Sequence, residues 1–297
     1  MNFKSGFVSI IGRPNVGKST LINKIIGEKA AIVSSKPQTT RNQLRGIYTE
    51  ERGQIIFVDT PGIHKAKNEL DKYMLDQAFE SLDGIDLIIF MVDGTSPPGK
   101  GDNFIRKQLK GIDTPVIVVM NKIDHLNNET LFKRLEDYEV KTGREVIPVS
   151  ASHGKNVSNL VDNIIEKLPE GPQFYPEDMY TDQWEKFIVS ELIREKAFQL
   201  TREEIPYGVA VVVEEMKERE EKNDGMFFIR ANVFVEKKSH KGIIIGKNGK
   251  MLKKLGSWAR KDIEKLMGTK VYLDLWVKVK KDWREDKNLL RQMGYKE

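Results

Sequence analysis

The sequence of 297 residues predicts an α/β protein in which a domain with a mostly parallel sheet precedes a smaller α+β domain. Apolar runs alternate with helical periodicity up to about residue 168, which is typical of a parallel sheet covered by helices on both faces. A glycine-rich turn joins the first apolar run to the first helix. After a proline-rich stretch that begins at Pro169, the order of elements changes. We therefore expect domains at residues 1–168 and 181–297, with a linker over residues 169–180.

Composition fits a soluble protein of two ordinary domains, because 39% of its residues are apolar and its net charge is only +5. The longest apolar stretch, around Leu87 to Val92, is far shorter than the ~20 residues of a membrane helix. No cationic stretch followed by an apolar core opens the chain, so we expect no signal peptide. The absence of cysteine excludes disulfides and thiolate metal sites, and the four histidines are scattered. We expect a cytosolic protein.

The elements of the first domain follow from hydrophobic periodicity. Short apolar runs predict the strands Phe7–Ile11, Gln54–Val58, Val116–Met120 and Glu145–Val149. Helical spacing predicts the helices Lys18–Ile26, Glu69–Leu82, Gly101–Lys110, Glu129–Lys141 and Asn156–Lys167.

Residues 12–19 read GRPNVGKS and match the P-loop pattern between a strand and a helix. Glycines in such a loop let backbone N–H groups turn toward phosphate oxygens, and the following helix adds its positive end. We expect Lys18 to reach the outer phosphates and Ser19 to ligate Mg²⁺. A glycine-rich turn without a ligand is the alternative. The residues expected at the nucleotide are Gly12, Arg13, Pro14, Asn15, Val16, Gly17, Lys18, Ser19 and Thr20.

A second motif, Asp59-Thr60-Pro61-Gly62, follows the strand that ends at Val58. Its aspartate is expected to hold Mg²⁺ through water, and the backbone N–H of Gly62 to contact the γ-phosphate. All four residues of this motif are expected at the nucleotide.

A third motif, residues 121–124 (NKID), follows the strand that ends at Met120 and identifies the base. A carboxylate such as Asp124 can accept both the N1–H and the N2–H₂ donors of guanine, whereas adenine has no such donor pair, so we predict GTP. Asn121 is expected to tie this loop to the P-loop, and the stem of Lys122 to cover one face of the base. A backbone N–H to guanine O6 is expected from Ser150, Ala151 and Ser152.

Each of these motifs alone could be an ordinary turn. Their order and spacing, on alternating strands and helices, favour one nucleotide site.

The second domain has a different order of elements. The pattern predicts, in order, a helix Gln183–Leu200, a strand Val209–Val213, a charged turn at residues 220–225, a strand Met226–Val235, a long helix ending at Met267 and a strand Val271–Val279.

A GxxG motif, residues 246–249 (GKNG), stands between two helical segments of this domain. KH domains use such a loop to clamp about four nucleotides of single-stranded RNA. Basic residues gather around it without an intervening acid, namely Lys237, Lys238, Lys241, Lys247, Lys250, Lys253, Lys254, Arg260 and Lys261. A solvated helix face would explain the charges alone, but their position beside a GxxG favours phosphate binding.

The residues expected to contact RNA are Ile245, Gly246, Lys247, Asn248, Gly249, Lys250, Lys253 and Lys254. Three tryptophans, Trp258, Trp276 and Trp283, are not assigned to RNA. Trp276 alternates with Leu275 and Val277, so we expect it to pack in the core.

These stretches together resemble the Era family of bacterial ribosome-associated GTPases. The resemblance covers essentially the whole chain and is carried by GRPNVGKSTLINKIIG, QTTR, DTPG, NKID, SAS, YPEDM, REEIP, IIIGKNGKMLKKLG and VYLDLWVKVKKDWR. It implies a Ras-like P-loop G domain followed by a type II KH domain, and a Mg²⁺-dependent GTPase. It also implies binding near the 3′ end of 16S ribosomal RNA, a role in 30S subunit assembly and rRNA maturation, and peripheral association with the inner face of the cell membrane. We expect a monomer.

The resemblance places a first switch at residues 38–41 (QTTR). It implies Thr40 as a Mg²⁺ ligand, with Thr39 as the alternative. A threonine that grips Mg²⁺ and the γ-phosphate only while GTP is intact would release this segment on hydrolysis.

Ile63 departs from the Ras-like scheme, because a glutamine at this position orients the attacking water in Ras. We therefore expect slow intrinsic hydrolysis. Related GTPases bind K⁺ through a P-loop asparagine, a role that falls on Asn15 and would stabilise the charge of the transition state. Asn15 could instead only fix the loop. The residues expected in catalysis are Asn15, Lys18, Thr40 and Gly62.

Three functions fit these residues. The favoured one is a GTPase switch whose nucleotide state controls RNA binding. The second is a GTP-binding scaffold whose hydrolysis is incidental, which Ile63 would favour. The third is a peripheral membrane protein that presents its lysines to anionic lipids.

Overall fold

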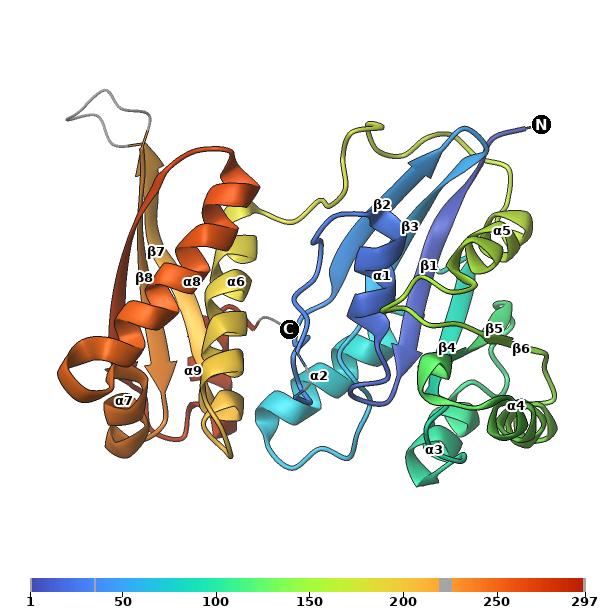
Figure 1. Cartoon of the computed structure of the whole chain (residues 1–297), viewed down its shortest axis with the longest axis horizontal. Helices are drawn as coiled ribbons and strands as arrows, with labels where there is room; N and C mark the ends of the chain where they lie inside the picture. The colour runs from blue at the N-terminus through green and yellow to red at the C-terminus, as the bar shows by residue number, and fades with distance from the viewer. Residues whose placement is uncertain (1, 35, 219–225, 296–297) are drawn as a thin grey trace. The chain divides into compact units, whose positions relative to one another are not determined.

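A computed structural model describes residues 2–34, 36–218 and 226–295 (Figure 1). The chain divides into two compact units, one of residues 1–67 and 71–182 and one of residues 68–70 and 183–297. The predicted turn at residues 220–225 lies outside the described residues. None of the described helices is long and apolar enough to cross a membrane.

The first unit contains a mixed sheet, which in the described residues has the strand order β2-β3-β1-β4-β5-β6. Strand β2 runs antiparallel to β3, and the other neighbouring strands are parallel. The expected α/β fold with a mostly parallel sheet is confirmed. The strands are β1 (Lys4–Gly12), β2 (Leu44–Glu50), β3 (Gly53–Asp59), β4 (Leu87–Asp93), β5 (Val116–Asn121) and β6 (Val146–Pro148).

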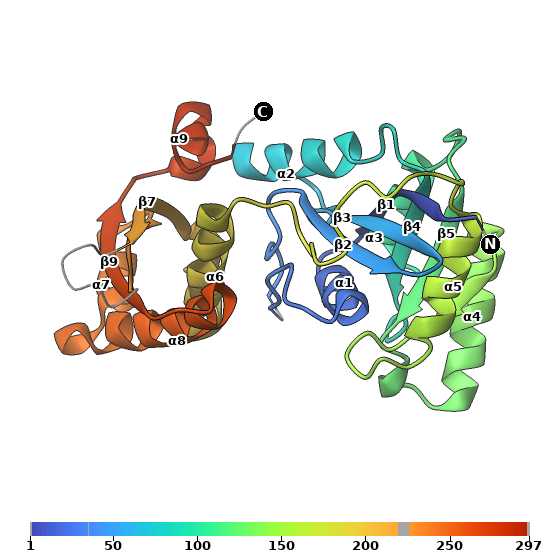
Figure 2. The same ribbon diagram turned by 90° about the horizontal axis from the view of Figure 1, so that it is seen from above.

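Helices cover both faces of this sheet, and Figure 2 shows α1 and α2 on opposite sides of it. Apolar residues of α1 and α5 pack on one face, and those of α2, α3 and α4 on the other. The helices are α1 (Lys18–Ile26), α2 (Glu69–Glu80), α3 (Lys100–Gln108), α4 (Asn128–Thr142) and α5 (Val157–Lys167). The carboxyl ends of β1, β3 and β5 carry the three predicted motifs, at the edge where such sheets bind ligands.

The segment that we expected to be a linker makes hydrogen bonds with the first unit. The Ser5 amide donates to the Pro169 carbonyl oxygen over 3.1 Å, and the Ile47 amide to that of Tyr180 over 2.9 Å. Arg45 pairs with Asp182 at 3.0 Å. The compact unit therefore continues to Asp182.

The second unit is a three-stranded sheet, within the described residues, in the order β7-β8-β9. Strands β7 and β8 are antiparallel, whereas β8 and β9 are parallel. The strands are β7 (Ala210–Glu218), β8 (Phe227–Val235) and β9 (Val271–Val279), and the helices are α6 (Glu185–Leu200), α7 (Lys238–Ile245), α8 (Lys250–Met267) and α9 (Lys287–Gln292). Helices α6 and α8 pack on one face of the sheet (Figure 1). This α+β arrangement agrees with the expected KH domain.

The expected core position of Trp276 is wrong. Alternate residues of β9 face opposite sides of the sheet, and Val271 and Val277 are the buried ones. Trp276 and Tyr272 therefore share the opposite face, where Trp276 is 58% exposed. The alternation was read correctly, but both faces of β9 carry large apolar side chains, so the pattern did not tell which face is covered. The buried tryptophan is Trp283, whose indole N–H donates to the Gly208 carbonyl oxygen over 3.0 Å.

Candidate nucleotide site and RNA groove

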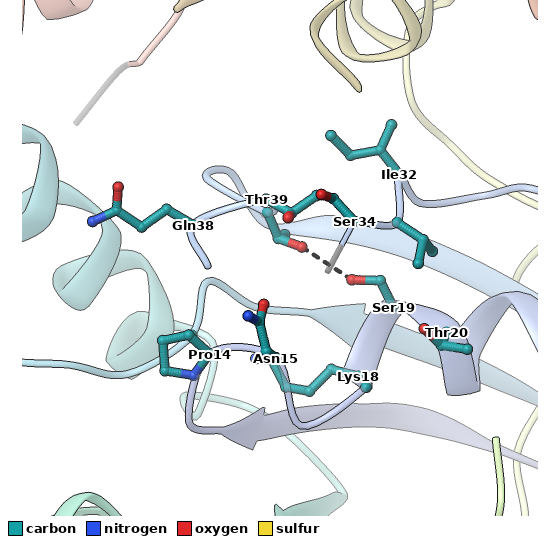
Figure 3. Close-up of a pocket in the computed structure, with 13 residues that line it drawn as sticks. Pro14, Asn15, Lys18, Ser19, Thr20, Ile32, Ser34, Gln38 and Thr39 are labelled. Carbon is teal, nitrogen blue, oxygen red and sulfur yellow. Dashed lines mark hydrogen bonds between the residues drawn. The ribbon is translucent and has the colours of Figure 1, made fainter. Parts of the chain in front are cut away.

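The P-loop turns between β1 and α1 through residues that adopt positive φ. Gly17, the residue before α1, has φ 103°, and Asn15 has φ 63°. A Cβ on Gly17 would lie 2.2 Å from Nδ2 of Asn121, so only glycine lets these two loops approach. Figure 3 shows the side chains of Asn15 and Lys18 beside the pocket that this loop forms with residues 32–34 and 38–40.

Lys18 and Asp59 are both buried at the floor of this site. Lys18 is 7% exposed, and burial lowers the pKa of its ammonium although Asp59 opposes the shift. Burial also raises the pKa of Asp59, against the attraction of Lys18. Both charged groups are thus poorly solvated, which favours binding of phosphate by Lys18 and of a cation by Asp59.

The three expected Mg²⁺ ligands meet at one point. The Ser19 hydroxyl donates to Asp59 Oδ2 over 2.6 Å and lies 3.0 Å from the Thr40 hydroxyl, which is 3.2 Å from the same oxygen. Asp59 Oδ1 is buried and has no hydrogen-bond partner among the described residues. Two hydroxyls and a carboxylate that lacks solvent form an oxygen set suited to Mg²⁺. Thr39 instead donates to the Lys36 carbonyl oxygen over 2.8 Å, so the structure places Thr40 at this point.

The motif after β3 packs closely on the P-loop. A Cβ on Gly62 would lie 2.6 Å from Pro14 Cα, so no side chain fits there. Thr60 is turned away from the pocket, and its hydroxyl donates to the Ile10 carbonyl oxygen over 2.7 Å. Ile63 is 2% exposed and packs in the core with Ile11 and Phe90. Its side chain therefore lies in the core between the sheet and the helices α2, α3 and α4, and it offers no group to a nucleotide.

A hydrogen-bonded group that the sequence did not reveal joins the first switch to α2. Gln38 Nε2 donates to Asp71 Oδ1 over 2.9 Å and lies 3.2 Å from His64 Nε2. His64 Nδ1 lies 2.9 Å from the Gly62 carbonyl oxygen. The hydrogen bond with Asp71 raises the pKa of His64. Residues separated in sequence thus connect both segments that flank the phosphate site, and only the fold brings them together.

The loop after β5 is tied to the P-loop by Asn121. Its Nδ2 donates to the Val16 carbonyl oxygen over 2.8 Å, and its Oδ1 accepts from the Ala151 amide over 2.9 Å. Lys122 has φ 68° and pairs with Asp93 at 2.6 Å, which fixes its stem. The sequence did not indicate Asp93 for this role.

Asp124 is held ready to accept hydrogen bonds. The Ser150 hydroxyl donates to its Oδ1 over 2.6 Å and lowers the pKa of Asp124. The carboxylate is therefore ionised at neutral pH. The Ser150 amide already donates to the Lys155 carbonyl oxygen, and the Ala151 amide to Asn121. Ser152 lies in the same loop, with its hydroxyl 3.3 Å from that of Ser150.

Arg13 points toward α3. Its guanidinium pairs with Asp102 at 2.9 Å and donates to the Ser96 hydroxyl over 3.2 Å. Val16 is buried in the core with apolar residues of α1 and α5, and Thr20 lines the pocket. The side chains of Arg13 and Val16 therefore do not line this pocket.

The GxxG loop in the second unit is a sharp turn between α7 and α8. Gly246 has φ 72°, and a Cβ there would lie 2.7 Å from Met251 Cβ. Asn248 and Gly249 also have positive φ. The side chains around the loop that we expect to contact RNA are exposed, namely Lys247, Asn248, Lys250, Lys253 and Lys254.

A groove with a cavity volume of about 490 Å³ begins at this loop and follows α8 along the edge strand β9. Pockets of this size hold small ligands in other proteins. The second wall of the groove could not be predicted from the sequence, because α8 and β9 come together only in the fold. The residues that line the groove are Gly249, Leu252, Lys253, Gly256, Ser257, Arg260, Tyr272, Leu273 and Leu275.

Comparisons with known proteins match both parts of the chain. The model of the 50S ribosome-binding GTPase family matches residues 7–122, and the KH domain model matches residues 204–284. GTPase Era of Halothermothrix orenii is 64% identical over 296 residues, covering 100% of both chains. The chain belongs to the Era family of GTPases. GTPase Era of Alkaliphilus oremlandii is 57% identical and covers 99% of this chain.

Solved Era structures have the same fold over the full length. A crystal structure of Era with MgGDPNP and nucleotides 1506–1542 of 16S ribosomal RNA has a TM-score of 0.96 and 41% identity, and 99% of each chain is covered. A variant of Aquifex aeolicus Era bound to GDP.AlF4− has a TM-score of 0.95 at 41% identity. The predicted family, its fold of a G domain and a KH domain, and its GTPase activity are confirmed.

Proposed function

We propose that this protein hydrolyses GTP as a switch and binds 16S ribosomal RNA near its 3′ end, and that it assists assembly of the 30S subunit and maturation of the rRNA. The proposal is supported by a relative of 41% identity that was crystallised with nucleotides 1506–1542 of this RNA. The observation in this chain that carries it is the exposed GxxG loop, with its lysines, at the mouth of an open groove.

Guanine recognition is assigned to the loop after β5. The ionised Asp124 accepts two hydrogen bonds from the base, the Lys122 stem covers one face, and Asn121 keeps this loop against the P-loop. The amides of Ser150 and Ala151 are engaged within the protein, so the Ser152 amide is our candidate donor to guanine O6.

Phosphate binding and hydrolysis are assigned to the P-loop and the two switches. Ser19, Thr40 and Asp59 would hold Mg²⁺, which supplies positive charge to the phosphates. Lys18 adds a buried cation whose pKa is already lowered by desolvation, so a bound phosphate would restore its charge balance. The backbone N–H of Gly62 donates to the γ-phosphate, where a side chain would collide with Pro14.

Potassium is the candidate substitute for the missing glutamine. Ile63 is buried in the core and offers no group to an attacking water. We assign K⁺ binding to Asn15, which has φ 63° and lines the phosphate pocket. A cation between the phosphates would stabilise charge that develops during cleavage.

The test measures GTP turnover with and without an RNA fragment of the 16S 3′ end, and RNA affinity with GDPNP or GDP bound. Stimulated turnover, or an affinity that depends on the nucleotide, is expected of a switch. If neither RNA nor nucleotide affects the other, the protein is a GTP-binding scaffold, the function that the buried Ile63 favours.

We propose that the protein acts as a monomer in the cytoplasm.

The family resemblance also implies peripheral membrane association, and the same lysines would face anionic lipid. Flotation with anionic liposomes in the presence of competing RNA tests it. Liposome binding that RNA does not compete would contradict the assignment of these lysines to RNA.

A further inference from the structure

Gly256 stands in the middle of α8, where glycine is a poor choice for a helix. The helix spans Lys250–Met267, and glycine is among the weakest helix formers because its backbone loses the most freedom. Gly256 is not among the described residues with positive φ. Its backbone conformation is therefore one that alanine adopts more readily.

Packing does not require glycine at this position either. A Cβ on Gly256 would meet, within 4 Å, only Leu275 Cδ1, at 3.4 Å, which is an ordinary van der Waals contact. Gly246 of the GxxG loop is different, because its φ is 72° and a Cβ there would lie 2.7 Å from Met251. Gly246 is needed by the fold, whereas Gly256 is not.

The position of Gly256 in the RNA groove offers a reason for glycine there, whereas helix formation and packing do not. It lines the groove beside Leu252 and Ser257, and the nearest residue of β9 is Leu275. It follows Gly249 by seven positions, which is roughly 10 Å along a helix. A single-stranded RNA held at the GxxG loop would therefore place a different nucleotide beside Gly256.

We propose that Gly256 is a specificity-determining residue of the RNA groove, where the missing side chain lets one unpaired base lie against the backbone of α8. The ligand is single-stranded RNA, whose bases offer flat faces to such a surface. Arg260 lies one helical turn further along the groove and is exposed, so its guanidinium is placed to contact the phosphate or base edge of the same nucleotide. This inference rests on the proposed RNA-binding function.

The test compares full-length Gly256→Ala with the parent protein and with Gly242→Ala. Gly242 is a matched control because it is also a helical glycine with open space around it, and it does not line the groove. Fluorescence anisotropy with a labelled oligonucleotide of the 16S 3′ end measures RNA affinity, and thermal unfolding measures stability. Loss of one base contact weakens binding roughly ten- to a hundredfold. We expect a loss of at least about tenfold for Gly256→Ala, an unfolding midpoint equal to or above that of the parent, and unchanged RNA affinity for Gly242→Ala.

A set of oligonucleotides with single abasic positions then identifies the base. At one position, removal of the base should weaken binding to the parent protein and cause no further loss with Gly256→Ala, because both changes remove the same contact.

Equal RNA affinity of the parent and Gly256→Ala would overturn the inference, and so would a lowered unfolding midpoint, which would show that the glycine serves packing. A parent protein that does not bind the RNA would overturn the proposed function itself, which is a distinguishable result.

Discussion

Replacement of Asp124 by asparagine should change the base that the protein selects. The carboxylate is ionised, because the Ser150 hydroxyl donates to it over 2.6 Å and its pKa is lowered. It can therefore accept two charge-assisted hydrogen bonds from guanine. Asparagine keeps the size of the side chain but exchanges one acceptor for a donor, which would face a donor on guanine and an acceptor on xanthine.

The magnitude follows from the two charge-assisted hydrogen bonds, of which one is lost and the other loses the charge of its acceptor. Hydrogen bonds to a charged group contribute about 1.5–3 kcal/mol each, and one tenfold change in affinity corresponds to about 1.4 kcal/mol. We expect the dissociation constant for GDP to rise by at least about a hundredfold, while that for xanthosine diphosphate falls. The Ser150 hydroxyl can still donate to the amide oxygen of asparagine, so the loop should keep its conformation.

The assay is a competition titration of a fluorescent guanine nucleotide with GDP and xanthosine diphosphate. Asp137→Asn is a matched control, because Asp137 lies on α4 and pairs with Arg134 at 3.2 Å, i,i+3 on the same helix. The control should keep the base preference of the parent. If Asp124→Asn prefers GDP as strongly as the parent does, the assignment of this loop to the base is wrong.

Three further predictions concern the phosphate site. GTP turnover should be faster in K⁺ than in Na⁺ at equal ionic strength, and Asn15→Ala should remove this difference but retain GDP binding; equal rates in both salts would refute the potassium site. Ile63→Gln should not speed hydrolysis and should lower the free energy of unfolding by roughly 2 kcal/mol or more, because it buries an amide in the core; faster turnover without loss of stability would show that residue 63 reaches the nucleotide. The raised pKa of His64 means that its pairing with Asp71 stabilises the fold fully below the unfolded pKa near 6.5 and that this contribution is lost as pH rises through the folded pKa. NMR titration of His64 should therefore give a lower pKa in Asp71→Asn, and an unchanged pKa would contradict the contact.

Much of the nucleotide site could be predicted because its residues follow strands directly in sequence. The predicted helix Lys18–Ile26 has the observed bounds, since glycines in left-handed conformations flank it at both ends. The motifs after β3 and β5 were placed by the apolar strands that precede them. Such motifs can be predicted because neighbouring residues determine the backbone conformation of the loop.

The missing parts depend on contacts between distant segments. Strand β2 was not predicted, because Leu44–Glu50 is interrupted by Arg45 and Gly46 and is held as a strand by pairing with β3. The pairing of Lys122 with Asp93 joins loops after two different strands. The second wall of the RNA groove requires β9 to lie beside α8, which no periodicity in either segment indicates.

One double variant tests most directly the central claim that GTP and RNA bind at separate sites. Lys247→Asp combined with Asn248→Asp places two carboxylates on an exposed loop that must approach a phosphate backbone. RNA binding is measured by anisotropy with an oligonucleotide of the 16S 3′ end, and GTP affinity and thermal unfolding are measured on the same sample. We predict that specific RNA binding is lost, whereas GTP affinity and the unfolding midpoint stay nearly unchanged. Unaltered RNA affinity would contradict the assignment of the GxxG loop, and a joint loss of GTP and RNA binding in a folded protein would contradict the separation of the two sites.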